Sequence, residues 1–101
     1  MNIFKKLLAI AFVIIFSYVP TLLAKDLVAI LLPENVNPRW ESQDAAFYVK
    51  HMKKLAPNIK VEVFNANNDT AGQQRQAEQA LSRGAKVLVV IPIDGEAAAV
   101  I

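Results

Sequence analysis

Two short, almost uninterrupted apolar runs constrain the fold of this chain more than any other feature. The sequence LVAILL occupies residues 27–32, and KVLVVIPI occupies residues 86–93. Runs this rich in Val, Ile and Leu indicate strands that are covered on both faces, as in a parallel sheet. A third segment, residues 60–66 (KVEVFNA), alternates instead, with Val61 and Val63 on one face and Glu62 and Phe64 on the other. This alternation predicts a half-exposed strand at the sheet edge.

Helical patterns separate the three predicted strands. Residues 39–56 carry apolar side chains at spacings of three, four and seven, which predicts one helical face against the sheet. That face comprises Trp40, Phe47, Tyr48, His51, Met52 and Leu55. A second helix is expected from a cap at Asp69 or Thr70 to Arg83, with Gly84 closing it. Its apolar face is thin (Ala77, Ala80 and Leu81), and GQQRQAEQ (residues 72–79) is interpreted as its polar face.

The order strand, helix, strand, helix, strand, start of a helix predicts an α/β fold in three layers, a parallel sheet with flanking helices. If the alternating second strand lies at the edge, the strand order is 2-1-3. The chain then reverses direction across the sheet between the first and third strands. Ligands of open α/β sheets bind at such a reversal, beyond the carboxyl ends of the strands. The loops expected there are PENVNPRW (residues 33–40) and PIDG (residues 92–95).

The first 24 residues differ from the rest of the chain. A basic start, MNIFKK, precedes the uncharged residues 7–24, which end in VPTLLA before Lys25. This layout predicts a cleaved secretory signal peptide over residues 1–24 and one small domain over residues 25–101. A retained membrane anchor is the alternative, although Pro20 interrupts the apolar stretch and Ala24 offers a small residue for cleavage. The chain has no cysteine, so we do not expect a lipoprotein, and the mature protein is expected to be free in the export compartment.

Charge and motifs exclude several function classes. Lys5 and Lys6 account for the net charge of +2, so residues 25–101 are close to neutral and a nucleic-acid partner is not expected. The sequence has no GxSxG, P-loop or GxGxxG motif, so an enzyme is not expected either. His51 is the single histidine, it lies within a predicted helix, and no carboxylate cluster accompanies it. We therefore expect neither a metal site nor a cofactor.

The two loops at the predicted reversal contain the candidate site residues. Trp40 can pack its indole against the apolar face of a sugar, or it can belong to the helix–sheet core. Arg39 offers five donors to hydroxyl groups or a carboxylate, but a solvated surface arginine is the simpler interpretation. Asn37 can donate and accept at once, or it can serve as a turn residue before Pro38. Glu34 and Asp94 are candidates for lining the cleft, with capping of the last helix as the favoured role of Asp94.

Several of these spaced features together resemble a known family. VAILLPENVNPRW, the Asn-rich turn NANNDT, the spaced glutamines of the second helix and GAKVLVVIPIDG are similar to the N-terminal part of periplasmic sugar-binding proteins of bacterial ABC importers. The xylose-binding and multiple-monosaccharide-binding group of type I periplasmic binding proteins shows the greatest likeness, and it covers residues 27–101. Relatives that bind ribose have two aromatic residues where this chain has Arg39 and Trp40, so the chain resembles the arginine-bearing group.

The resemblance implies a two-domain protein that closes on one sugar, such as xylose, glucose or galactose, in the periplasm. Asn37, Arg39 and Trp40 then correspond to ligand contacts of the N-terminal domain. The implied partners are the ABC transporter permease and, in some family members, a chemoreceptor. Further contacts of the family, from an Asp-Arg pair after the fourth strand and from the second domain, have no counterpart here, so we expect a partial N-terminal domain from a truncated product. The alternative function is an exported or membrane-tethered small α/β module that acts through protein contacts or signalling.

Overall fold

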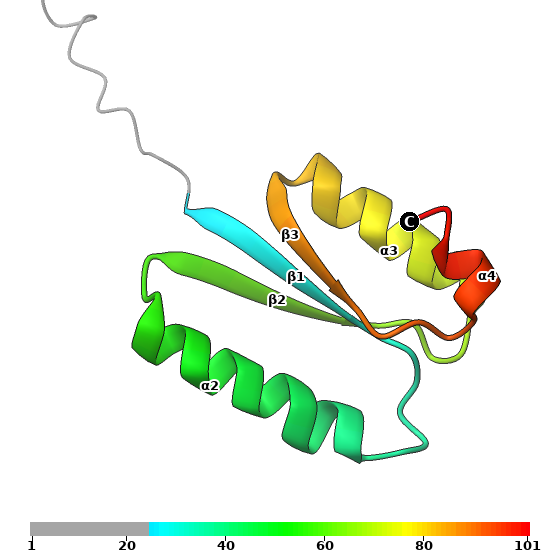
Figure 1. Cartoon of the computed structure of the whole chain (residues 1–101), viewed down its shortest axis with the longest axis horizontal. Helices are drawn as coiled ribbons and strands as arrows, with labels where there is room; N and C mark the ends of the chain where they lie inside the picture. The colour runs from blue at the N-terminus through cyan, green and yellow to red at the C-terminus, as the bar shows by residue number, and fades with distance from the viewer. Residues whose placement is uncertain (1–24) are drawn as a thin grey trace, which may run out of the picture.

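The computed structural model describes residues 25–101, and the predicted signal segment, residues 1–24, lies outside the described residues. Along the described chain, strands and helices alternate as the apolar patterns predict (Figure 1). The strands are β1 (Asp26–Leu32), β2 (Ile59–Asn65) and β3 (Ala85–Val90). The helical segments are η1 (Trp40–Ala45), which is a π-helix, α2 (Ala46–Leu55), α3 (Thr70–Ser82) and the short α4 (Gly95–Ala98). None of these helices is long and apolar enough to cross a bilayer.

The three strands form a parallel sheet in the order β2-β1-β3, which confirms the predicted order. In the register, Ile30 of β1 lies beside Val63 of β2 and Val89 of β3. Successive side chains of a strand point to opposite faces, so these three residues share one face of the sheet. Leu31, one residue further along β1, belongs to the other face.

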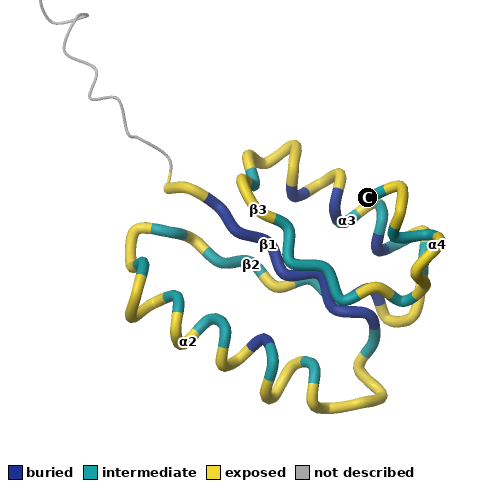
Figure 2. Tube along the Cα trace, in the orientation of Figure 1, coloured by how far each residue is buried: buried dark blue, intermediate teal, exposed yellow. Residues whose placement is uncertain are grey.

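The helices cover the two faces and give the predicted three layers. α2 lies on one side of the sheet, and α3 lies on the other with α4 beside it (Figure 1). β1 is the central strand, and all of its residues from Leu27 to Leu32 are buried, while β2 and β3 are less covered (Figure 2). Among the described strands, β2 and β3 therefore form the outer edges, as predicted for the alternating β2.

The predicted apolar face of the first helix is wrong in part. Phe47, His51 and Leu55 are exposed, and Phe47 keeps 56% of its surface accessible. Instead, Ala45 is buried, and Trp40 and Tyr48 pack with it against β1. Trp40, Ala45 and Tyr48, at spacings of five and three, thus belong to the side that packs on the core.

The π-helical η1 explains this difference. In a regular α-helix, residues 47, 51 and 55 would lie on the same side as Trp40, as the sequence pattern predicts. A π-helix uses bonds between residues five apart and so contains one extra residue per turn. One extra residue rotates everything that follows by about 100°. The side of α2 that faces the sheet therefore begins at Ala45, and the stripe Phe47–His51–Leu55 points to solvent.

The termini of α3 agree with the sequence, but part of its predicted surface does not. Asp69 occupies the N-cap position, and Gly84 follows the helix with a φ of +94°, a conformation that glycine adopts without steric cost. Ala77 and Ala80 are buried as predicted, whereas Leu81 is exposed. The predicted polar face is wrong at Gln73, which is only 2% exposed.

A pair of matched leucine substitutions tests which surfaces are packed. Leu32 has no accessible surface, and Leu55 is 78% exposed. Leu32→Ala should lower the free energy of unfolding by about 2–5 kcal/mol, because it leaves a cavity in the core. Leu55→Ala should change it by less than about 0.5 kcal/mol. Urea unfolding followed by circular dichroism measures both, and equal midpoints for the two variants would contradict the packing described here.

Candidate functional site

The carboxyl ends of β1 and β3 lie next to each other, as expected at the reversal of the chain. The Ile91 amide donates to the Leu31 carbonyl at 3.0 Å and so extends the pairing beyond the end of β3. The loop after β1, residues 33–39, and the loop after β3, residues 91–94, both leave the sheet at this edge. The candidate residues of the sequence belong to these two loops and to the first residue of η1.

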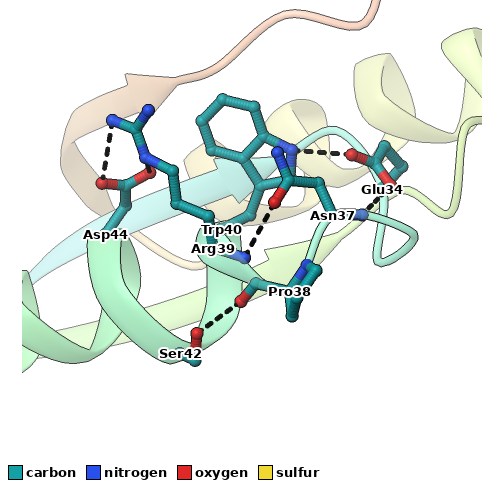
Figure 3. A network of polar contacts seen from close by, with 7 residues as sticks. All are labelled: Glu34, Asn37, Pro38, Arg39, Trp40, Ser42 and Asp44. Carbon is teal, nitrogen blue, oxygen red and sulfur yellow. Dashed lines mark hydrogen bonds and ion pairs between the residues drawn. The ribbon is translucent and has the colours of Figure 1, made fainter.

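Glu34 organises the first loop (Figure 3). One carboxylate oxygen accepts a hydrogen bond from the Trp40 indole, with Nε1 at 2.7 Å from Oε1. The other accepts from the Val36 amide and from the Asn37 amide, the latter at 3.0 Å. A single carboxylate thus fixes both the turn of the loop and the orientation of the indole. Glu34, expected as a cleft-lining residue, has its carboxylate engaged inside the loop.

These bonds favour the charged form of Glu34. The bond from the Asn37 amide is the largest influence and lowers the pKa of Glu34 below its ordinary value of 4.5. Partial desolvation opposes this effect, while the bonds from the Trp40 indole and the Val36 amide lower the pKa further. The carboxylate therefore remains an acceptor for the indole throughout the neutral and mildly acidic range.

Trp40 combines the two roles considered for it. Its ring is partly buried and packs against the core cluster of Ile30, Leu32 and Ala45. Its nitrogen edge points the other way, to Glu34 in the loop (Figure 3). The indole is therefore held rigidly at the boundary between the core and the loop surface.

Arg39 lies across the indole and is oriented by an acid. The guanidinium carbon is 5.5 Å from the centre of the Trp40 ring, within the range of a cation–π contact. Arg39 Nε pairs with Asp44 Oδ2 at 3.1 Å. The side chain is still 60% exposed, so the guanidinium is presented to solvent in a defined position. The simpler interpretation as a surface arginine holds for its exposure, but its side chain is ordered by two neighbours.

Asn37 adopts a turn role in this structure. Its Oδ1 accepts from the Arg39 amide at 3.1 Å, which closes a side-chain turn around Pro38. The Pro38 carbonyl in turn accepts from the amide of Ser42 at 3.0 Å and from its hydroxyl at 2.6 Å. This turn leads the chain into η1 and sets the direction in which Arg39 and Trp40 leave the backbone.

Asp94 lies apart from this group. Its carboxylate accepts from the Glu96 amide at 2.8 Å and caps α4, which is the role that the sequence favours. Within residues 25–101, no hydrogen bond or ion pair joins Asp94 to the network of Glu34, Asn37, Arg39 and Trp40. The structure thus brings four of the five predicted site residues together and leaves the fifth at the neighbouring loop.

Gln73 positions that neighbouring loop, a role that was not expected from the sequence. Its Nε2 donates to the Ile91 carbonyl at 2.9 Å, and its Oε1 accepts from the Ile93 amide at 3.2 Å. This buried amide therefore replaces a neighbouring strand for residues 91–93. The signal was present in the spacing, because Gln73 shares one helical face with Ala77 and Ala80.

The described residues also contain an open groove away from this loop. It has a volume of about 830 Å³ and lies between α2 and β2. Its lining comprises Glu41, Ala45, Ala46, Val49, Lys50, Lys53, Lys54 and Val63. None of the predicted site residues belongs to it, so the groove does not identify a ligand for the loop. Over residues 25–101, no three His, Asp or Glu side chains are placed to share a metal ion.

The pKa of Glu34 leads to a pH-dependent prediction. The pKa of Glu34 is lower in the folded chain than in the unfolded chain. The charged carboxylate therefore stabilises the fold fully above pH 4.5, and this stabilisation is lost as the pH falls through the pKa of Glu34 in the folded chain. Trp40 is the single tryptophan, so its fluorescence reports directly on the bond. Titration to about pH 3 should change the Trp40 emission with a midpoint below 4.5. Glu34→Gln, which does not titrate, should lose this transition, and an unchanged transition in that variant would assign it to another group.

Comparison with known proteins gives two findings. The model of a family described as periplasmic binding protein domain matches residues 28–101. The crystal structure of an ABC transporter solute-binding protein from Clostridium phytofermentans, with bound β-D-glucose, superimposes with a TM-score of 0.63 at 33% sequence identity. The match covers 69% of this chain and 21% of that one, so the chain spans about a fifth of the length of this relative. No curated protein matches the chain.

The match and the fold agree with each other. The family model begins within β1 and extends over all the strands and helices described above. The three parallel strands in the order β2-β1-β3 with their flanking helices form a partial α/β domain of the solute-binding type. The chain belongs to the periplasmic binding protein family.

Proposed function

We propose that this chain is the substrate-binding component of an ABC-type monosaccharide importer, or a part of one, and that it binds a sugar without changing it. Xylose, glucose and galactose are the sugars that fit the proposal. The observation that carries it is the arrangement of the loop after β1, in which Glu34 fixes the Trp40 indole and Asp44 orients the Arg39 guanidinium over it. The glucose-bound relative supports the same class of ligand.

The chemistry of this loop suits a monosaccharide. A sugar ring has an apolar face of C–H groups and a rim of hydroxyl groups. An indole supplies a flat apolar surface, and a guanidinium supplies several donors in a fixed plane. Both groups have partners within the chain, Glu34 for the indole and Asp44 for the guanidinium, and this restraint reduces the entropy that binding must overcome.

The proposal also assigns a place and partners to the chain. Members of this family work in the periplasm, and residues 1–24 are proposed as the signal peptide that directs export. An ABC transporter permease is the proposed membrane partner. Because the chain spans about a fifth of the solute-binding relative, the second surface that closes over the sugar is proposed to come from sequence beyond residues 25–101.

A second candidate function is contact with another protein. Phe47 and Leu55 are exposed on α2, and Val87 is exposed on β3. Exposed apolar side chains that form a contiguous patch often mark a contact with another polypeptide, and Phe47 and Leu55 lie on one side of α2. This candidate predicts that the chain binds no sugar and that cell fractionation recovers it with a protein partner or in the membrane fraction.

Calorimetric titration of the whole chain with xylose, glucose, galactose and arabinose tests the first proposal. Arg39→Ala should weaken binding about 10- to 100-fold, because a hydrogen bond to a charged group contributes about 1.5–3 kcal/mol. Arg75→Ala is the matched control, since Arg75 is also an exposed arginine paired with an aspartate, Asp69, but lies on α3.

Saturable heat from the wild type, with a selective loss in Arg39→Ala, supports sugar binding by this loop. Equal affinities for Arg39→Ala and Arg75→Ala would remove Arg39 from the site. No heat from a sample that circular dichroism shows to be folded would reject sugar binding by this chain on its own, and recovery of the same chain with a protein partner or in the membrane fraction would then support the second candidate.

A further inference from the structure

We propose that Asn65 is a positioning residue of the candidate site: its side-chain amide sets the conformation of the loop after β1 and thereby the orientation of Trp40. The part of this inference that concerns sugar rests on the function proposed above. The part that concerns the indole does not, and it can be tested without a ligand. From its sequence, the segment around Asn65 is expected to form only a turn with a helix cap.

Asn65 joins the two ends of the loop. It is the last residue of β2, and its Nδ2 donates to the Glu34 carbonyl at 3.1 Å. The same nitrogen donates to Glu41 Oε1 at 3.0 Å. Glu34 lies at the start of the loop, and Glu41 is the second residue of η1. One amide group from a neighbouring strand therefore spans the segment that carries Asn37, Arg39 and Trp40.

The amide of Asn65 is itself fixed in place. Its Oδ1 accepts from the Asn67 amide at 2.9 Å, and its backbone carbonyl accepts from Gln76 Nε2 at 2.9 Å. The bond to Asn67 determines which side of the Asn65 group carries the oxygen, so the nitrogen must face the loop. The bond from Gln76 connects this end of β2 to α3.

The turn after Asn65 makes a second connection to the same loop. Asn67 and Asn68 have positive φ values of 51° and 63°, a left-handed conformation that asparagine tolerates better than most residues. This conformation turns the Asn68 amide toward the Pro33 carbonyl, to which it donates at 2.8 Å. The segment 65–68 thus contacts the loop at both Pro33 and Glu34, so the turn serves as its support.

The route from Asn65 to Trp40 passes through Glu34. Asn65 holds the backbone of Glu34, and the Glu34 carboxylate accepts from the indole. Hydrogen bonds weaken steeply when their distance or angle departs from the optimum. A displacement of the Glu34 backbone therefore moves the acceptor away from the indole, even though Asn65 itself does not touch Trp40 in any hydrogen bond.

An amide is required at this position on chemical grounds. The group must donate twice from one atom and accept on the other, and a carboxylate supplies acceptors only. Asn65→Asp keeps the shape but removes both donor bonds, and it places a negative charge beside the Glu41 carboxylate. This substitution should therefore disturb the loop with little change in volume.

The test uses the single indole N–H resonance of Trp40, measured by proton–nitrogen NMR on the protein purified from cells that express the full chain. Asn65→Asp should move this resonance toward the position of a free indole and raise its hydrogen-exchange rate about tenfold or more, as expected for loss of one hydrogen bond. Asn58→Asp, the same change in the turn between α2 and β2, is the matched control and should leave the resonance unchanged. Asn65→Ser, which shortens the side chain without adding charge, should act in the same direction and serves if the aspartate variant does not fold.

A reversal of the donor and acceptor separates positioning from general destabilisation. In the Asn65→Asp background, Glu41→Gln supplies an amide that can donate to the new carboxylate. The double variant should recover part of the wild-type indole shift, because the hydrogen bond between positions 65 and 41 is restored with its donor and acceptor exchanged. An indole resonance in Asn65→Asp and Asn65→Ser that equals that of Asn58→Asp would overturn the proposal. A double variant without any recovery would assign the effect to the bond with the Glu34 carbonyl rather than to the bond with Glu41.

Sugar titration of the same samples distinguishes this inference from the proposed function. If the wild type binds sugar and Asn65→Asp binds at least tenfold more weakly while its indole is displaced, both are supported. If the indole responds as expected but the wild type binds no sugar, sugar binding fails and the positioning of Trp40 stands. If sugar binds equally to Asn65→Asp and Asn58→Asp with an unchanged indole, the positioning role fails and sugar binding stands.

Discussion

The central position of β1 is the constraint on which the rest of this structure depends. β1 is paired along its length with β2 on one side and β3 on the other, and its apolar side chains are covered by η1 and the start of α2 on one face and by α3 on the other. A strand enclosed in this way must be apolar throughout, which is why six consecutive residues, 27–32, show no alternation. Pro33 is still buried, and the chain leaves the core directly after it. The loop that follows begins from a rigid point, and this rigidity is passed to Glu34 and Trp40.

The loop itself is ordered by polar contacts from three directions. Glu34 orders it from within, Asp44 orients Arg39 from the following helical turn, and Asn65 supports its backbone from the neighbouring strand. Gln73 supports the backbone of the adjacent loop after β3 in the same way. Asn65 and Gln73 both act through side-chain amides. An amide can pair with a backbone N–H and a backbone carbonyl without introducing a buried charge. Hydrogen bonds and an ion pair between nearby side chains thus fix the loops at this edge of the sheet, and the order of the strands determines which loops lie there.

The sequence predicted the long-range arrangement better than this short-range chemistry. Apolar runs and their alternation were sufficient for the three strands, their order and the three layers, because burial on one or both faces leaves a direct trace in the pattern. The π-helical turn left no such trace, since a single extra residue alters the phase of a helix without altering its composition. Phe47 and Leu55 were therefore assigned to the wrong side. Gln73 and Asn65 were interpreted by polarity alone, and polarity does not reveal whether an amide faces solvent or a backbone group.

The π-helical η1 has a further consequence for how such a chain can diverge. It separates the orientation of Trp40 from the orientation of α2, because the extra residue takes up the rotational mismatch between them. Aromatic and charged residues of this surface loop can then be substituted while α2 keeps the same packing against the sheet. Conversely, a regular α-helix over the same residues, with no residue lost, would bring Phe47 and Leu55 to the side of Trp40 in place of Ala45 and Tyr48. The hydrogen-bonding pattern of this one turn, rather than the apolar pattern of α2, therefore determines which side of the helix packs on the sheet.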